Sequence, residues 1–388
     1  MNIKIPWKII SLILSWKFCV IALTLFASSI LPFNSAVFKG NFSYPKDQKI
    51  TISTSLKTWD AQHYLYLADA GYKPDQASNW FYPLYPLTIK IMNFITHKSF
   101  ISALLISNVF SFFGLLFFYF FVRSKFNENI AYYSLILFIA FPTAFYLNLI
   151  YSEGLFFFLL AGFFLSLFKK KYLLVALFSC LLPFTRSVGI FIIIPLLISL
   201  IVNKGKGIQI RIPTFNVPIR FKFYPVYILL LFPFFGFAIN LIYIYFGTGN
   251  AFSEFTAQKY FIGGYFVSNL FSPNVFFSNL FTTKFSLHGL TNSILDRTFF
   301  VLFLSLLPLI YRKFGKPMFY FYLAIILVPL LGSFMGYMRY LIPAFIPLSI
   351  ALALLFDRRK YLFFPILLIL LMLQSFFIIL QALNYWVS

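Results

Sequence analysis

The sequence predicts an all-α, polytopic membrane protein, and three observations support this fold class. Hydrophobic residues make up 61% of the 388 residues and charged residues only 10%, which is not the composition of a soluble globular domain. Apolar runs of about 15–25 residues recur along the whole chain, as transmembrane helices require. Most of the lysines and arginines lie in short segments between these runs, as the positive-inside rule describes. The net charge of +22 therefore indicates membrane topology, and we expect no nucleic-acid partner.

The first apolar run, residues 9–33, predicts a retained transmembrane helix. It is longer than the roughly 7–15 apolar residues of a cleavable signal peptide, and no A-x-A cleavage site follows it. Applying the same criterion along the chain predicts roughly eleven transmembrane helices. The expected spans are about 9–33, 101–122, 130–150, 154–168, 172–184, 188–202, 225–246, 298–311, 318–335, 341–356 and 361–386.

The apolar segment at about 83–96 decides the topology. If it lies at the membrane surface and the N-terminus is inside, the basic clusters all fall on the inner side. These clusters lie at residues 123–125, 169–171, 204–222, 312–316 and 358–360. If the segment spans the membrane, all of them move outside, against the positive-inside rule. We therefore expect a surface helix at 83–96 and an integral multi-pass protein with a cytoplasmic N-terminus, in the cell membrane if the source is prokaryotic.

The region 172–202 is expected to form two short helices instead of one long helix. A single helix would place the basic run that follows it on the outer side. Pro183 removes a helix hydrogen bond and favours a break just before Arg186.

This threading leaves two large loops on the outer face, residues 34–99 and 247–296. Both are too long to be simple connections. The whole chain, 1–388, is expected to be one integral membrane domain without a separate soluble part. Most of the nine acidic residues fall on the outer side: Asp47, Asp60, Asp69, Asp75, Glu153, Glu254 and Asp296.

The first outer loop predicts a short helix over residues 59–70. Thr58 is a suitable N-cap, and Gly71 followed by Pro74 is a suitable stop. Helical spacing then places Asp60, His63 and Tyr64 on one face. An acid in the first turn of a helix is also favourable through the helix dipole alone.

A second segment of this loop, Asn79 to Leu87, is rich in aromatic residues and proline. It contains Trp80, Phe81, Tyr82 and Tyr85 together with Pro83 and Pro86. Aromatic residues of this kind anchor at the headgroup level of a membrane, and the prolines fix the entry of the next helix.

These two segments resemble the signature of the PIG-V-type mannosyltransferases, which include the enzyme that adds the second mannose in glycosylphosphatidylinositol assembly. The resemblance covers Trp59-Asp60-x-x-His63-Tyr64, Ala68-x-x-Gly71-Tyr72 and Phe81-Tyr82-Pro83-Leu84-Tyr85-Pro86. Weaker matches follow at Tyr151-Ser152-Glu153, at Arg186-Ser187-x-Gly189 and at Met338-Arg339-Tyr340 with Pro343 and Pro347. Val188 departs from the family's Arg-Ser-Asn-Gly pattern. The matches extend from about residue 59 to residue 347 and so cover most of the chain.

The resemblance implies a GT-C glycosyltransferase fold and a sugar donor linked to polyprenyl or dolichyl phosphate. It implies a site on the non-cytoplasmic face, with Asp60 as the catalytic base. The topology derived from charge independently places Asp60, Glu153, Arg186 and Arg339 on one face. The expected reaction is an inverting transfer of a sugar, by the resemblance mannose, to a lipid or glycan acceptor.

Other residues receive roles in the same hypothesis. Arg186 and Arg339 are expected to bind the donor phosphate, because guanidinium groups match phosphate oxygens. His63 either contacts this phosphate or orients the loop of Asp60. Sugar or acceptor contacts, or loop positioning, are expected for Glu153, Tyr64, Trp59 and Tyr82. No D-x-D motif occurs, so we expect metal independence and no cofactor besides the lipid-phosphate-linked sugar.

Each of these residues also has a purely structural interpretation. The arginines can snorkel to lipid headgroups, and Glu153 can serve as a helix-dipole partner. Lys17 is a charge inside the first span and either snorkels or faces a groove that holds the lipid phosphate.

Three other interpretations remain open at this point. One is a polytopic transporter or lipid-linked sugar flippase. A second is a purely structural or scaffold membrane protein. The third is a GT-C enzyme with another sugar or a protein acceptor. Transporters usually place polar groups near mid-membrane, whereas the acids here gather in outer loops.

Overall fold

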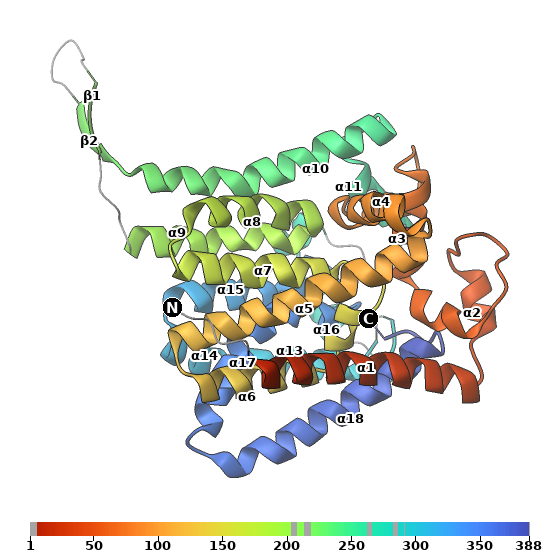
Figure 1. Cartoon of the computed structure of the whole chain (residues 1–388). Helices are drawn as coiled ribbons and strands as arrows, with labels where there is room; N and C mark the ends of the chain where they lie inside the picture. The colour runs from red at the N-terminus through yellow and green to blue at the C-terminus, as the bar shows by residue number, and fades with distance from the viewer. Residues whose placement is uncertain are drawn as a thin grey trace.

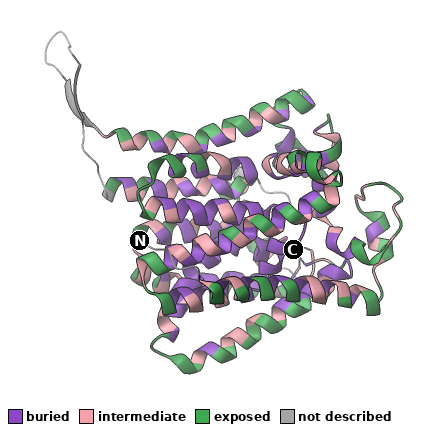
Figure 2. Ribbon diagram, viewed as in Figure 1, coloured by how far each residue is buried: buried purple, intermediate pink, exposed green. Residues whose placement is uncertain are grey.

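Helices of unequal length run side by side through most of the molecule (Figure 1). The structure is a computed structural model that describes residues 6–202, 208–212, 219–261, 266–281, 286–290 and 292–387. Buried residues concentrate in the middle of the bundle, and exposed residues concentrate on its outer helices (Figure 2). Helix α7 (Glu153–Phe168), for example, is buried over most of its length.

Four helices are long and apolar enough to cross a membrane. They are α1 (Trp7–Ile30), α5 (Ser99–Lys125), η5 with α10 (Pro225–Leu231 and Phe232–Thr248), and η9 with α18 (Lys360–Leu362 and Phe363–Ala382). The pair α13 (Ile294–Ser305) and α14 (Leu307–Phe314), bent by 42°, makes a fifth if it is one span. The chain is therefore an all-α integral membrane protein by class. The expected number of roughly eleven spans is not confirmed, because the other apolar helices are shorter.

Two further expected spans end early, and in each case a proline lies just after the end of the helix. The span at 130–150 is a helix only as far as α6 (Glu128–Ala140), and the 3-10 helix η3 (Ala144–Asn148) follows. Pro142 disfavours helical backbone at the residue before it, and Phe141 has φ −56° and ψ 135°. The span at 318–335 ends as α15 (Lys316–Ile326), and η8 (Val328–Leu331) with Pro329 follows.

The break predicted near Arg186 is confirmed. Helix α8 (Tyr172–Thr185) ends there, and Arg186 itself is extended, with φ −157° and ψ 148°. The 3-10 helix η4 (Ser187–Ile192) and α9 (Ile193–Val202) follow. Gly189 permits this return, because a Cβ at that position would lie 2.3 Å from the carbonyl oxygen of Leu182.

The basic run at 204–222, expected to be an inner loop, contains the two described strands. Strands β1 (Ile208–Ile212) and β2 (Ile219–Phe223) pair antiparallel, with Ile208 opposite Phe223 and Ile212 opposite Ile219. Figure 1 shows this hairpin standing away from the helices.

The segment 34–99 folds into short helices. These are α2 (Ser35–Gly40), η1 (Ile52–Lys57), α3 (Asp60–Ala70), η2 (Ala77–Trp80) and α4 (Leu84–Thr96). The helix predicted at 59–70 is thus confirmed to within one residue. Thr58 is not its cap: the N-cap is Trp59, and the Thr58 hydroxyl bonds Gln381 of α18 instead. A helix is also present at 83–96, and its position at the membrane surface stays a prediction.

The segment 247–296 packs against 34–99. It contains α11 (Ser253–Thr256), η6 (Ala257–Tyr260), η7 (Val267–Phe271) and α12 (Pro273–Leu280). Both α11 and η6 contact η2, and Lys259 forms an ion pair with Asp75 at 2.8 Å. The helices α16 (Tyr337–Tyr340) and α17 (Ile342–Phe356) complete the described elements.

Candidate functional site

Four charged side chains meet in one network inside the molecule, and each comes from a different part of the chain. Arg339 Nη1 of α16 lies 2.7 Å from Asp60 Oδ2 of α3, and Arg339 Nε lies 3.3 Å from Glu153 Oε1 of α7. Arg186 Nη1, at the end of α8, lies 2.5 Å from the same Glu153 oxygen. We call Asp60, Glu153, Arg186 and Arg339 the charge network. The structure thus brings together the four charged residues that the sequence predicted for the site. His63, which the sequence also predicted for the site, is not one of them.

The charge network is buried to different depths. The side chain of Glu153 is 3% exposed, Arg339 10%, Arg186 14% and Asp60 19%. Burying a charge is costly unless an opposite charge and hydrogen bonds compensate it. Two carboxylates alternating with two guanidinium groups provide the opposite charges, with no net charge. Arg186 Nη1 also donates hydrogen bonds to Glu153 Oε1 and Ser152 Oγ. Within the described residues, Glu153 Oε2 and Arg339 Nη1 have no hydrogen-bond partner. Asp60 is the member most accessible from outside.

The backbone before Asp60 has an unusual conformation. Trp59, its N-cap, has a φ of 55°, a region that non-glycine residues rarely occupy. The Trp59 ring packs edge-on against Trp386, with the ring centroids 5.1 Å apart. Strained backbone of this kind occurs often at functional sites. Here it sets the direction in which α3 begins and therefore where the Asp60 carboxylate points.

Glu153 is the first residue of α7, where the helix dipole favours a carboxylate. Gly154 follows it, and a Cβ there would lie 2.6 Å from the Ser107 carbonyl oxygen of α5. The glycine therefore lets the start of α7 approach α5 closely. Ser152 extends the charge network, because its hydroxyl accepts from Arg186 Nη1 at 3.1 Å and bonds the Tyr64 hydroxyl at 2.9 Å.

Aromatic faces support both guanidinium groups. Arg339 lies over the rings of Tyr146 and Tyr151, 5.4 and 5.3 Å from their centroids. Arg186 lies 5.7 Å from the centroid of Tyr340. Cation–π contacts of this kind are strongest where water is excluded. They fix the planes of the two guanidinium groups as well as their positions.

His63 lies outside the charge network. Its ring is stacked between Phe42 and Phe81, with centroids 4.1 and 4.7 Å away, and Nδ1 lies 2.9 Å from Ser78 Oγ. Burial lowers the pKa of His63 to about 3, so the ring is neutral at ordinary pH. These contacts fit the expectation that His63 orients the loop. Direct binding of a phosphate by His63 stays a prediction.

Tyr82 leads to an acid that the sequence analysis left without a role. The Tyr82 hydroxyl donates to Glu254 Oε1 at 3.1 Å, and Asn240 Nδ2 donates to Oε2 at 2.7 Å. Burial raises the pKa of Glu254 to about 7. Glu254 therefore joins α11 of the second large loop to the aromatic segment of the first. Acidic residues are rare in this chain, so the presence of Glu254 was the signal available from the sequence. Its partners Tyr82 and Asn240 are too distant in sequence to be inferred.

Asp296 and Lys17 also have defined partners. Asp296 Oδ1 accepts from the backbone N–H of Met338 at 3.0 Å, so this acid holds the segment that carries Arg339. Lys17 does not snorkel: its ammonium group is buried and donates to Ser111 Oγ at 2.6 Å and Asn148 Oδ1 at 2.7 Å. Both partnerships are long-range contacts that no local pattern predicts.

A small cavity borders the charge network and is lined in part by Glu153, Arg186 and Arg339. In the part of the chain that the structure describes, no three His, Cys, Asp or Glu side chains cluster so as to hold a metal ion. The expectation of metal independence stays a prediction.

No protein-family model matches the chain, and no curated protein sequence matches it. Among solved structures, the chain is similar to the Archaeoglobus fulgidus oligosaccharyltransferase tethered with an acceptor peptide. The two sequences are 11% identical, and the TM-score is 0.44. The match covers 95% of this chain and 55% of the oligosaccharyltransferase chain.

Two further structures of that protein are similar. The form in complex with Zn and sulfate has 13% identity, 94% and 53% coverage and a TM-score of 0.43. The form with an inhibitory peptide and a dolichol-phosphate has 11% identity, 95% and 56% coverage and a TM-score of 0.43. The chain spans about half the length of these matched chains. Likeness at this level decides neither fold family nor activity, so the proposal below depends on the chain's own residues.

Proposed function

We propose that the chain is an inverting glycosyltransferase of the GT-C type. It would move a sugar from a polyprenyl- or dolichyl-phosphate-linked donor to a lipid or glycan acceptor. The observation that supports this most is the charge network, in which an acid of the first large loop meets two arginines that come from distant segments. This chemistry needs a base for the acceptor hydroxyl and cations for the phosphate that leaves.

Asp60 is the base in this proposal. It takes the proton of the acceptor hydroxyl while the hydroxyl oxygen attacks the anomeric carbon, and the lipid phosphate leaves from the opposite side. Asp60 suits this role better than Glu153, because its side chain is 19% exposed and that of Glu153 only 3%. A positioned general base contributes about 10²–10⁴-fold to the rate.

The two arginines act on the leaving group. The phosphodiester of the donor becomes a phosphomonoester, so negative charge grows on its oxygens, and a fixed cation stabilises that charge. Arg339 lies between the two carboxylates and is held by both. Arg186 is the second cation. Glu153 Oε1 accepts from Arg186 Nη1 at 2.5 Å and lies 3.3 Å from Arg339 Nε, so we assign Glu153 to holding both arginines and not to binding sugar.

Aromatic residues of the first large loop complete the proposed site. Trp59 and Tyr64 position Asp60 and Ser152, and Tyr82 connects the site to Glu254. The choice of mannose, the polyprenyl carrier and the non-cytoplasmic location follow from the family resemblance and the charge-derived topology.

A transfer assay tests the proposal. Membranes that contain the full-length chain, Asp60→Asn or Asp75→Asn receive polyprenyl-phosphate mannose with labelled sugar and a lipid extract of the native host. Asp75 is the matched control, because it belongs to the same loop but is 73% exposed. We expect transfer by wild type and Asp75→Asn and a loss of at least about 100-fold in Asp60→Asn.

Other results of the assay contradict parts of the proposal. Equal transfer by wild type and Asp60→Asn removes Asp60 as the base. Transfer of glucose from polyprenyl-phosphate glucose, without transfer of mannose, supports the glycosyltransferase assignment and contradicts the choice of mannose as the sugar. No transfer from either donor contradicts the glycosyltransferase assignment.

One observation favours the alternative of a transporter or lipid-linked sugar flippase. Lys17 is buried within α1 and bonds polar groups of α5 and η3, which is the kind of intramembrane charge found along transport pathways. Proteoliposomes loaded with lipid-linked sugar would distinguish the two functions. The alternative expects translocation by wild type that Lys17→Met abolishes, together with no sugar transfer.

A further inference from the structure

A pocket of about 330 Å³ lies at the far end of the bundle from the charge network. Helix α7 connects the two: it begins at Glu153, and its last residue, Phe168, lines the pocket. Its 16 residues separate the two sites by about 24 Å along the helix axis. Figure 1 shows α9 and α14, which also line the pocket, at the end of the bundle opposite α3 and α4.

The walls of this pocket are mostly apolar. Of the described side chains that line it, only Lys125 and Lys170 are charged, and phenylalanine, leucine, proline and methionine supply most of the remainder. Phe168 and Tyr172 are 45% and 40% exposed, so the pocket opens at an aromatic rim. A volume of this size suits the headgroup and adjoining part of an amphiphile better than a bare ion.

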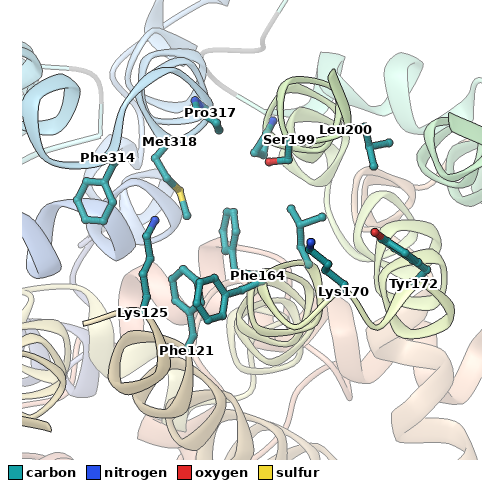
Figure 3. A pocket seen from close by; sticks show the side chains of 13 residues that line it. Phe121, Lys125, Phe164, Lys170, Tyr172, Ser199, Leu200, Phe314, Pro317 and Met318 are labelled. Carbon is teal, nitrogen blue, oxygen red and sulfur yellow. The ribbon is translucent and has the colours of Figure 1, made fainter. Parts of the chain in front are cut away.

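The two lysines approach the pocket from different helices. Lys125 is the last residue of α5, and its ammonium nitrogen lies 5.2 Å from the ring centroid of Phe314. Lys170 lies in the turn between α7 and α8. Figure 3 shows their ammonium groups on either side of Phe164 in this view. Over the described ranges, neither lysine has a carboxylate within ion-pair distance, and Glu128 pairs with Arg123 instead.

The backbone at Lys170 is also notable. It has a φ of 54° and lies two residues after the end of α7, at a position that usually favours glycine. The N–H of Lys171 bonds the carbonyl of Ser166. A lysine therefore occupies a turn with a strained backbone beside the pocket. The described residues that line the pocket thus include two lysines and no carboxylate.

We propose that this pocket binds an anionic phospholipid, with the headgroup phosphate between Lys125 and Lys170. The glycerol and upper acyl chains would then lie against Phe121, Phe164 and Phe168. Basic pockets between helices at the inner side of a membrane take up anionic headgroups in this way. The charge-derived topology places this end of the bundle at the inner leaflet, where anionic lipids are found. The apolar walls favour the lipid over a soluble phosphate.

Native mass spectrometry of the full-length protein in detergent tests this inference. The wild-type chain is titrated with phosphatidylglycerol, with phosphatidylcholine of the same acyl chains, and with glycerol phosphate as the free headgroup. We expect clear preference for phosphatidylglycerol and no competition by glycerol phosphate at equal concentration. Equal binding of phosphatidylcholine, or full competition by glycerol phosphate, overturns the proposal.

Variants locate the bound lipid. Lys125→Ala with Lys170→Ala is expected to weaken phosphatidylglycerol binding about 25-fold, from about fivefold for each lysine near an anionic headgroup. Lys169→Ala with Lys313→Ala is the matched control, since these basic neighbours do not line the pocket. It should change binding by less than about twofold.

A third variant keeps both charges. Ser199→Trp, on α9, fills the pocket and is also expected to abolish the preference for phosphatidylglycerol. The melting temperature of each variant in detergent shows that the folded protein is measured. Unchanged binding by either the double-lysine variant or Ser199→Trp overturns the proposal.

Discussion

Basic side chains have carboxylate partners at one end of the helix bundle and lack them, among the described residues, at the other. In the charge network, Arg186 and Arg339 are buried, and each has a carboxylate within 3.3 Å. At the other end, Lys125 and Lys170 line a half-open pocket without a carboxylate partner among the described residues. The difference indicates that ion pairing with a carboxylate is what holds a basic side chain in place in this protein. Paired guanidinium groups form a rigid site, whereas the lysines remain available to an external anion.

The largest expected effect comes from removing a buried cation. Arg339→Met leaves Asp60 without its ion-pair partner and Glu153 with one cation, because both carboxylates contact Arg339. We expect a loss of about 3–5 kcal/mol in the free energy of unfolding, as for other broken buried ion pairs. Thermal unfolding in detergent measures it.

The control for Arg339→Met is an exposed ion pair. Arg123→Met breaks the contact with Glu128, whose atoms are 3.9 Å apart on side chains that are 40% and 71% exposed. Its cost should be about 0–1 kcal/mol. Equal losses in the two variants would show that the charge network does not depend on its arginine.

The next effect depends on pH and concerns Glu254. Burial raises its pKa from the ordinary 4.5 to about 7, so the folded state favours the protonated acid. Its contribution to stability is therefore complete below pH 4.5 and is lost as the pH rises through 7, by up to about 3 kcal/mol.

Hydrogen exchange of residues 250–261 between pH 5 and pH 8 measures this dependence. Protection should fall with pH in wild type and stay constant in Glu254→Gln, which keeps a neutral side chain in contact with Tyr82. The same pH dependence in both proteins would mean that another group titrates.

A smaller loss is expected where two backbone segments approach closely. Gly189→Ala places a Cβ 2.3 Å from the Leu182 carbonyl oxygen and must push η4 away from α8. Overpacking of this kind costs about 1–3 kcal/mol, and it should also displace Arg186. Gly40→Ala is the control, because no atom lies within 4 Å of its added Cβ. A melting temperature of Gly189→Ala equal to that of Gly40→Ala would contradict the close approach.

The smallest effect is expected at the other end of the bundle. Lys125→Ala with Lys170→Ala removes no ion pair of the described residues and should change the free energy of unfolding by less than about 1 kcal/mol. Chemical or thermal unfolding without added lipid measures this. A loss as large as that of Arg339→Met would indicate that these lysines are structural.

Much of the fold near the charge network follows from local signals in the sequence. Gly71 is the stop signal for the helix predicted at 59–70, and Pro183 is the signal for the break predicted at Arg186. The structure contains both the helix and the break. The Phe141-Pro142 pair is a local signal for the early end of α6, which the expected span at 130–150 does not reflect. Charge patterning placed four residues on one face, and in the structure these residues are in contact.

Long-range partnerships explain what the sequence did not reveal. His63 stacks on Phe42, Glu254 meets Tyr82, and Asp296 holds the backbone at Met338. Each of these contacts depends on how distant segments pack, and nothing in the local pattern of either partner specifies the other. The expected number of roughly eleven spans is not confirmed for a related reason, since apolar helices shorter than a bilayer look like spans in a composition profile.

The proposal that Asp60 and Arg339 act as one unit in sugar transfer is tested most directly by a double-mutant cycle. Single-turnover transfer rates are measured for wild type, Asp60→Asn, Arg339→Met and the double variant, each corrected for folded protein. We predict that each single variant loses at least about 100-fold and that the double variant is hardly slower than the slower single one, because groups that act together are not additive. Losses that multiply in the double variant, or an Asp60→Asn rate equal to wild type, would contradict the proposal.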